Sequence, residues 1–207
     1  CELRAVHLDH GLHPDSSRWA AHCRSVCERL DIPLRVLAVR VGPRGGDSVE
    51  ALARAARYEA ISGVLRAGDA VATAQHRDDQ AETVLLALLR GAGVHGLAGM
   101  ARCAPLGQGE LIRPLLAHGR AALEMYARCR SLAWIEDPSN ADTRFDRNLL
   151  RREVLPLLRE RWPGLDKTLA RSAPHCGEAA RLLDGEADAL LAEASGSRPG
   201  TLSVPVL

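Results

Sequence analysis

Short apolar runs alternate with longer stretches of helical spacing along the first half of the chain. The apolar runs lie at residues 3–8, 34–41 and 70–74, and each has the length of a buried strand. Apolar residues three or four positions apart follow these runs and predict helices over residues 16–30, 49–65 and 79–90. Strands that alternate with helices predict an α/β fold with an open, mostly parallel sheet and helices on both faces.

The second half of the chain is predicted to be mainly helical. The glycine-rich residues 91–99 favour a closely packed turn in place of a long helix. Apolar spacing predicts helices over residues 121–131, 149–158 and 166–194. The last of these is expected to break near Pro174, because proline cannot donate a helical hydrogen bond. Residues 133–135 are predicted as a strand-like piece and residues 137–140 as a turn.

Composition excludes several classes of protein. The hydrophobic share of 46% is typical of a globular domain, while a net charge of +1 gives no global attraction to nucleic acid. The six cysteines contain no C-x-x-C pair, which argues against zinc or redox sites and favours reduced thiols. Cys23 and Cys27 lie one helical turn apart and are expected to be buried or half-buried. Without a signal peptide or a long apolar run, the sequence predicts a cytoplasmic protein with no membrane segment.

Polar residues gather after the first predicted strand, where α/β sheets bind ligands. The segment 7–15 reads HLDHGLHPD and contains metal-ligand types close together. The metallohydrolase pattern H-x-H-x-D-H is not met, because no histidine stands two positions before His7. His7 also lies inside the strand, where a hydrogen-bonded core histidine is the alternative. A metallohydrolase stays open as one interpretation of this cluster.

A second polar cluster opens the helix that begins near residue 79. His76, Asp79 and Glu82 are three residues apart and share one face of the first turns. Acidic residues at a helix N-terminus gain about 0.3–1 kcal/mol each from the helix dipole, which accounts for Asp78 and in part for Asp79. The dipole does not account for His76 or Glu82. Carboxylates that face a cleft suit a cation, either Mg²⁺ or a substrate ammonium group.

Two arginines on the predicted helix 49–65 are a third candidate. Arg54 and Arg57 are one turn apart, and guanidinium groups bind phosphate through paired hydrogen bonds. Arginine is common throughout this chain, so spacing alone favours a solvated helix face.

Six stretches taken together, in this order, resemble a known family. They are VHLDHGLHPDS (6–16), EALARAARYEAI (50–61), TAQHRDDQAETVLLALLRGAGVHGLAGM (73–100), LIRPLL (111–116), WIEDPSNAD (134–142) and RNLLRREVLPLL (147–158). The family is the tRNA(Ile)-lysidine synthetases of the PP-loop, or N-type, ATP pyrophosphatases. The resemblance implies an adenine nucleotide α-hydrolase-like fold. It implies a PP-loop catalytic domain over residues 1–165, then a helical linker and the start of a truncated tRNA-binding region over residues 166–207.

The resemblance also implies an activity and its partners. The family ligates L-lysine to C2 of the wobble cytidine of tRNA(Ile) with a CAU anticodon, and it uses ATP and Mg²⁺. ATP first adenylates the C2 oxygen with release of pyrophosphate, and the lysine ε-amine then displaces AMP. A homodimer is compatible with this assignment.

Site residues follow from the same resemblance. Catalytic roles fall to Asp79, Glu82 and Arg57, substrate binding to Asp78, His76 and Arg54, and Mg²⁺ binding to Asp78 and Asp79. The nucleotide is expected beside Asp9, His10 and Gly11. tRNA is expected at Arg147, Asn148 and Arg151, within residues 144–171, where eight basic residues outnumber four acidic ones.

One departure from the family pattern matters for activity. The S-G-G-x-D-S loop that cradles the ATP phosphates does not occur in the 207 residues, so this chain alone is expected not to hydrolyse ATP. A non-catalytic tRNA-binding remnant is therefore one alternative. A sister PP-loop tRNA thiolase is another, although the C-x-x-C pairs common in such enzymes are absent here.

Overall fold

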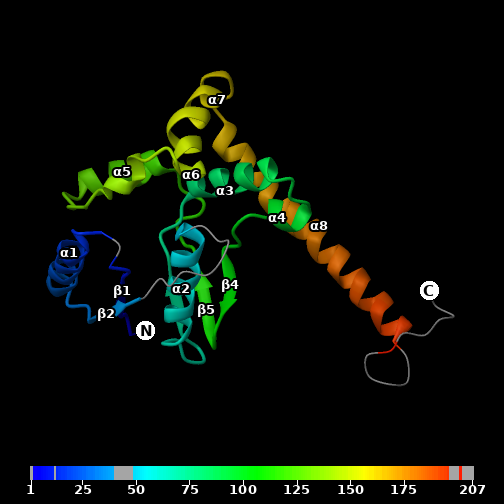
Figure 1. Ribbon diagram of the computed structural model, residues 1–207, viewed down its shortest axis with the longest axis horizontal. Helices are drawn as coiled ribbons and strands as arrows, with labels where there is room; N and C mark the ends of the chain where they lie inside the picture. Colours follow the sequence, from blue (N-terminus) through cyan, green and yellow to red (C-terminus); the bar gives the residue numbers. More distant parts are fainter. Residues whose placement is uncertain (1, 12, 40–48, 196–200, 202–207) are drawn as a thin grey trace. The chain divides into compact units, whose positions relative to one another are not determined.

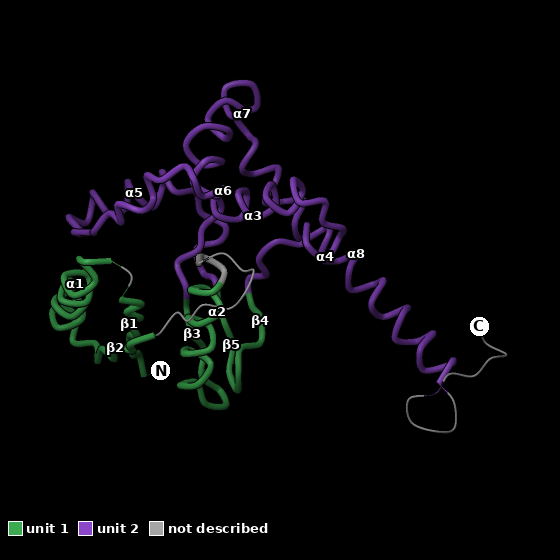
Figure 2. The backbone as a smooth tube through the Cα atoms, viewed as in Figure 1, with its two compact units in different colours: residues 1–72, 103–112 green, residues 73–102, 113–207 purple. Residues whose placement is uncertain are grey.

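The computed structural model describes residues 2–11, 13–39, 49–195 and 201 (Figure 1). The chain divides into two compact units (Figure 2). Unit 1 contains residues 1–72 and 103–112, and unit 2 contains residues 73–102 and 113–207. The end of the strand predicted over 34–41 lies outside the described residues, and so do most of residues 195–207, the end of the predicted tRNA-binding region.

Unit 1 begins with a parallel strand pair. Strands β1 (Ala5–Asp9) and β2 (Leu34–Ala38) pair in register from Ala5 opposite Leu34 to Asp9 opposite Ala38. Helix α1 (Ser16–Arg29) forms the crossover that a parallel pair requires. The pair therefore sets the polar segment after β1 at the carboxyl end of a strand, as the sequence predicts.

A second sheet in unit 1 has the order β3-β5-β4. Helix α2 (Val49–Ser62) leads to β3 (Ala70–Ala72), which pairs in parallel with β5 (Gly109–Ile112). Strand β4 (Cys103–Leu106) joins β5 as an antiparallel hairpin and was not predicted. Its Pro105 weakens the strand pattern but is tolerated at the edge of this sheet. The predicted class, α/β with mostly parallel strands, is confirmed.

Unit 2 is helical. Its elements, in chain order, are α3 (Arg77–Leu89), α4 (Val94–Leu97), α5 (Arg120–Cys129), the 3₁₀ turn η1 (Pro138–Ala141), α6 (Asp146–Leu149), the π-helical turn η2 (Leu150–Val154), α7 (Leu155–Arg161) and α8 (Leu165–Ala194). The predicted strand-like piece at 133–135 is wrong: these residues have no strand structure, and Trp134 and Ile135 are exposed. Two apolar side chains without a strand partner cannot form a sheet by themselves.

Helix α8 packs along α3 and α4 (Figure 1). Its contact face is built from small residues, with Ala173 and Ala180 both buried. The predicted break at Pro174 is wrong, because α8 runs without interruption over 30 residues. Packing of this small-residue face holds the helix together across the proline and overrides its local preference. No helix among the described residues is both long enough and apolar enough to cross a membrane.

Candidate active site

The predicted acidic cluster lies at the start of α3. His76 is the N-cap residue, and its Nδ1 accepts a hydrogen bond from the Asp79 backbone N–H at 3.3 Å. The Asp79 Oδ2 accepts one in return from the His76 backbone N–H at 3.0 Å. This reciprocal capping box satisfies two of the free N–H groups at the helix start. It supplies the structural reason for His76 that the helix dipole alone does not give.

Asp78 connects α3 to two other helices. Its Oδ2 accepts a hydrogen bond at 3.0 Å from the backbone N–H of Arg120, the first residue of α5. Its Oδ1 lies 3.6 Å from Nη2 of Arg159 in α7. Arg159 also binds Asp166 through two hydrogen bonds of 2.8 Å. Sequence reasoning missed Arg159, because no local pattern links it to Asp78 from so far along the chain.

Glu82 is the most deeply buried carboxylate of the cluster, with 1% of its side chain exposed. Nε of Arg147 donates to Oε2 at 2.7 Å. Arg151 donates to both carboxylate oxygens, from Nε to Oε1 at 2.6 Å and from Nη2 to Oε2 at 2.8 Å. Two guanidinium groups therefore neutralise one buried carboxylate, in the geometry that favours strong charge-assisted hydrogen bonds.

The same arginines reach Asp79. Nη2 of Arg151 donates to Asp79 Oδ1 at 3.2 Å, and Nη2 of Arg147 donates to the Asp79 carbonyl oxygen at 3.2 Å. Arg147 lies in α6 and Arg151 in the π-helical turn η2, and a spacing of four residues brings both to one face. The hydrogen bond to Glu82 is the main cause that raises the pKa of Arg151 above its usual value. In this structure, arginines are thus the cations that lie among the carboxylates.

Asn148 holds the turn that precedes these arginines. Its Nδ2 donates to the carbonyl oxygens of Ser139 and Asp142, both at 2.9 Å. Asp137 starts that turn, because its Oδ1 accepts the Ser139 backbone N–H at 2.8 Å. The contacts described for Arg147, Asn148 and Arg151 are all internal to unit 2, and their assignment to tRNA stays a prediction.

The residues predicted to bind the nucleotide lie in unit 1. Asp9 Oδ1 accepts the Gly11 N–H at 2.9 Å, and Gly11 adopts a φ of +60°, which suits glycine. Both ring nitrogens of His10 are buried without a hydrogen-bond partner among the described residues. Burial first, and the nearby Arg57 charge second, lower the pKa of His10. A neutral imidazole with unsatisfied nitrogens suits a polar ligand group.

The two predicted phosphate-binding arginines differ in their surroundings. The Arg54 guanidinium lies over the Tyr58 ring, 5.3 Å from its centroid. Arg57 is exposed and forms no ion pair within the described residues. The Arg57 charge is therefore uncommitted, whereas the Arg54 guanidinium is placed against an aromatic ring. The strand residue His7 contacts a thiol of helix α1, because Cys23 Sγ lies 3.5 Å from its Nδ1. Cys23 and Cys27 are half-buried free thiols, and burial is the main cause that raises the pKa of Cys23.

The carboxylates assigned to Mg²⁺ are already engaged. Each oxygen of Asp78 and Asp79 lies beside a backbone N–H or a guanidinium group of this chain. Across the part of the chain that the structure describes, no group of three or more histidine, cysteine, aspartate or glutamate side chains could hold a metal ion. These residues as arranged do not fit an open cation site, and the Mg²⁺ assignment stays a prediction.

The predicted site is thus assembled as two sets. Asp9, His10, Gly11, Arg54 and Arg57 belong to unit 1. The second set, His76, Asp78, Asp79, Glu82, Arg147, Asn148 and Arg151, is brought together inside unit 2.

The chain belongs to the PP-loop domain family, whose profile matches residues 1–158. It is 50% identical over 206 residues to a tRNA(Ile)-lysidine synthase of Methylococcus capsulatus, covering 99% of this chain and 47% of the relative. It is 52% identical over 197 residues to a tRNA(Ile)-lysidine synthase of Pseudomonas putida, covering 95% of this chain and 46% of the relative. The chain therefore spans about half the length of the curated relatives it matches.

A solved structure shares the fold. The U34-tRNA thiolase NcsA from Methanococcus maripaludis, with its [4Fe-4S] cluster, superposes with a TM-score of 0.67. The match covers 88% of this chain and 63% of the thiolase at 16% sequence identity. At that identity the likeness concerns the fold alone.

Proposed function

We propose that this chain provides the PP-loop part of an ATP-dependent tRNA-modifying ligase that joins lysine to C2 of the wobble cytidine of tRNA(Ile). The observation that carries the proposal is 50% identity to a tRNA(Ile)-lysidine synthase across 99% of the chain. Membership of the PP-loop family supports the use of ATP. The cluster on α3 supplies one partly exposed carboxylate, that of Asp79, as a candidate partner for an amine substrate.

The proposed reaction has two steps. The C2 oxygen of cytidine attacks the α-phosphorus of ATP, and the bond to pyrophosphate breaks. The ε-amine of lysine then attacks C2, the C2–O bond breaks, and AMP leaves with the oxygen while the amine loses a proton. The C2 carbonyl is a poor electrophile on its own, so AMP is needed to convert its oxygen into a leaving group.

Within this proposal, Asp79 is the group that meets the lysine amine and accepts its proton. Its side chain is 17% exposed, compared with 1% for Glu82. Glu82 contributes by fixing Arg147 and Arg151 beside Asp79. Arg57 and the Asp9–Gly11 turn are proposed to meet the phosphates and the nucleoside of ATP. Mg²⁺ is proposed as the partner of the ATP phosphates, without an assigned ligand set.

A chimaera tests the proposal directly. The 207-residue chain would replace the matching segment of the Methylococcus capsulatus relative, and the protein would be incubated with ATP, Mg²⁺, lysine and a tRNA(Ile) transcript. Mass spectrometry of the digested tRNA is expected to find lysidine at the wobble position. The 207-residue chain assayed alone is the second arm, and it is expected to release no pyrophosphate.

A chimaera that folds and binds tRNA but forms no lysidine would contradict the proposed reaction. Binding of tRNA by the 207-residue chain without any ATP-dependent product in the chimaera would favour the non-catalytic remnant.

A further inference from the structure

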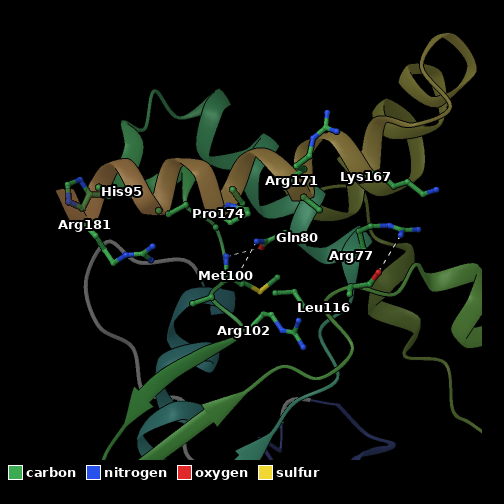
Figure 3. A pocket seen from close by; sticks show the side chains of 18 residues that line it. Arg77, Gln80, His95, Met100, Arg102, Leu116, Lys167, Arg171, Pro174 and Arg181 are labelled. Atoms are coloured by element: carbon green, nitrogen blue, oxygen red, sulfur yellow. Dashed lines mark hydrogen bonds between the residues drawn. The ribbon is translucent and has the colours of Figure 1, made fainter. Parts of the chain in front are cut away.

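A pocket lies inside unit 2, beside the first turn of α3, and none of the clustered carboxylates lines it. It lies between α8 on one side and residues 98–102 with Leu116 on the other (Figure 3). Its volume is about 690 Å³, within the range of small-molecule sites. None of the residues proposed above for catalysis or nucleotide binding lines it.

The base of the pocket is held in one shape. The Gln80 side chain forms two hydrogen bonds with the Met100 backbone, accepting from its N–H at 2.8 Å and donating to its carbonyl at 3.0 Å. Gly99 has a φ of +60°, and a Cβ there would lie 2.9 Å from Gln80 Oε1. Gly177 of α8 lies close to Ala98 on the facing side. A preformed cavity of this kind costs little ordering when a ligand enters.

The charged side chains around the pocket have one sign. Arg77, Arg102, Lys167, Arg171 and Arg181 line it, and no aspartate or glutamate does. Figure 3 shows Arg181 at one end and Arg77 with Lys167 at the other. The chain as a whole has a net charge of only +1, so this concentration of cations is local.

These cations are available to a ligand. Arg102, Lys167 and Arg181 are exposed and form no ion pair within the described ranges. Arg77 donates from Nη1 to the Ala117 carbonyl at 3.4 Å, but its buried Nε has no partner there. His95 is engaged, because its ring meets Asp184 at 2.8 Å. The free charges call for an anionic ligand.

The surface between the cations is apolar. Met100, Leu116 and Pro174 line it, together with several alanines. An apolar slot bordered by cations matches a planar base flanked by phosphates. A free phosphate would leave the apolar surface unused, and an uncharged apolar ligand would leave the cations unused.

We infer that this pocket binds an unstacked nucleotide of single-stranded RNA, with Arg102 and Arg181 meeting the flanking phosphates. The inference rests on the proposed function, which requires the protein to bind tRNA. It names a second RNA contact, separate from the reacting cytidine beside Asp79.

The test uses the 207-residue chain without ATP or lysine, so it does not depend on turnover. The probe is a fluorescent stem-loop RNA with CAU in its loop, and binding is measured by anisotropy at several salt concentrations. The charge variant is Arg102→Glu with Arg181→Glu, and its matched control replaces two exposed arginines of unit 1, Arg24→Glu with Arg35→Glu. The charge variant is expected to weaken binding at least about tenfold and to lower the salt slope by about one for each lost contact.

A second variant tests insertion separately from charge. Ala101 is exposed and lines the pocket, so Ala101→Trp adds bulk there without a change of charge. It is expected to weaken RNA binding several-fold and to leave the salt slope unchanged. AMP is the third probe, and it is expected to bind far more weakly than the RNA.

Three results would overturn the inference. Equal RNA affinity in the charge variant and its control would exclude a role for the pocket's cations in RNA binding. RNA affinity unchanged by Ala101→Trp would show a charged surface without an inserted base. Tight AMP binding that both pocket variants abolish, with RNA affinity intact, would make this a site for free nucleotides. None of these results bears on lysidine formation by the chimaera, which tests the proposed function alone.

Discussion

A carboxylate with 1% exposure is stable only if its charge is compensated, and Glu82 shows how this chain achieves it. The spacing of His76, Asp79 and Glu82 correctly indicated one helical face. The sequence could not indicate what lies opposite, because Arg147 and Arg151 follow Glu82 by more than 60 residues. Long-range pairs of this kind depend on tertiary packing, which local spacing does not encode.

Removing the buried charge should destabilise unit 2. Glu82→Gln leaves Arg147 and Arg151 without their main anionic partner, so we expect a loss of about 3 kcal/mol in the free energy of unfolding. Urea unfolding followed by tryptophan fluorescence measures it, since Trp134 and Trp162 lie in this unit. Glu186→Gln, on the exposed face of α8, is the matched control and should change stability by less than about 0.5 kcal/mol. Equal effects of the two substitutions would contradict the role assigned to the ion pairs.

His10 should give unit 1 a dependence on pH. Its pKa is lowered in the folded state from 6.5, so the unfolded chain binds the proton first as the pH falls through that value. Stability present above pH 6.5 is therefore lost below it. His10→Asn removes this contribution, and its unfolding free energy should fall less between about pH 7.5 and about pH 5.5 than that of the parent chain. Urea titrations followed through Trp19 make this comparison. If the buried imidazole were protonated in the folded state, the unfolding free energy of His10→Asn would instead fall more steeply than that of the parent chain.

At the scale of elements, α8 shows why local propensity misled the sequence prediction. Pro174 lowers the helical preference of its own turn, but Ala173 and Ala180 are buried against neighbouring helices. The packing free energy of the whole helix outweighs one lost hydrogen bond. The strand β4 was missed for a related reason, since Pro105 hides an edge strand that β5 nevertheless pairs with.

Two glycines, one in α8 and one in α4, should respond to substitution in opposite directions. A Cβ at Gly177 would lie 3.5 Å from the Ala98 Cβ, an ordinary contact, so Gly177→Ala should stabilise the protein by about 1 kcal/mol through helix propensity. A Cβ at Gly96 would lie 2.5 Å from the Ala92 Cβ, so Gly96→Ala should destabilise it by about 1–3 kcal/mol. Thermal or urea unfolding compares them. A loss of stability in Gly177→Ala would mean that α8 packs closer than described.

For the whole molecule, the alternation of strands and helices was enough to predict the α/β class, because the spacing of apolar residues follows the face that each strand or helix buries. The division into two units could not be predicted, since residues 103–112 return to unit 1 from within unit 2. The six motif stretches, in contrast, indicate the family from the residues alone. The match to the PP-loop family confirms that part of the assignment, and the similarity to tRNA(Ile)-lysidine synthases agrees with the rest. The structure adds the division of the predicted site residues between two units.

The central claim is that the acidic face at the start of α3 carries out the lysine step. The most direct measurement is the initial rate of lysidine formation by the chimaera carrying Asp79→Asn. Asp146→Asn is the matched control, because Asp146 is exposed and pairs only with the exposed Arg90 among the described residues. We predict a rate at least about a hundredfold lower for Asp79→Asn, with unchanged tRNA affinity, and a normal rate for Asp146→Asn. A normal rate with Asp79→Asn would contradict the account.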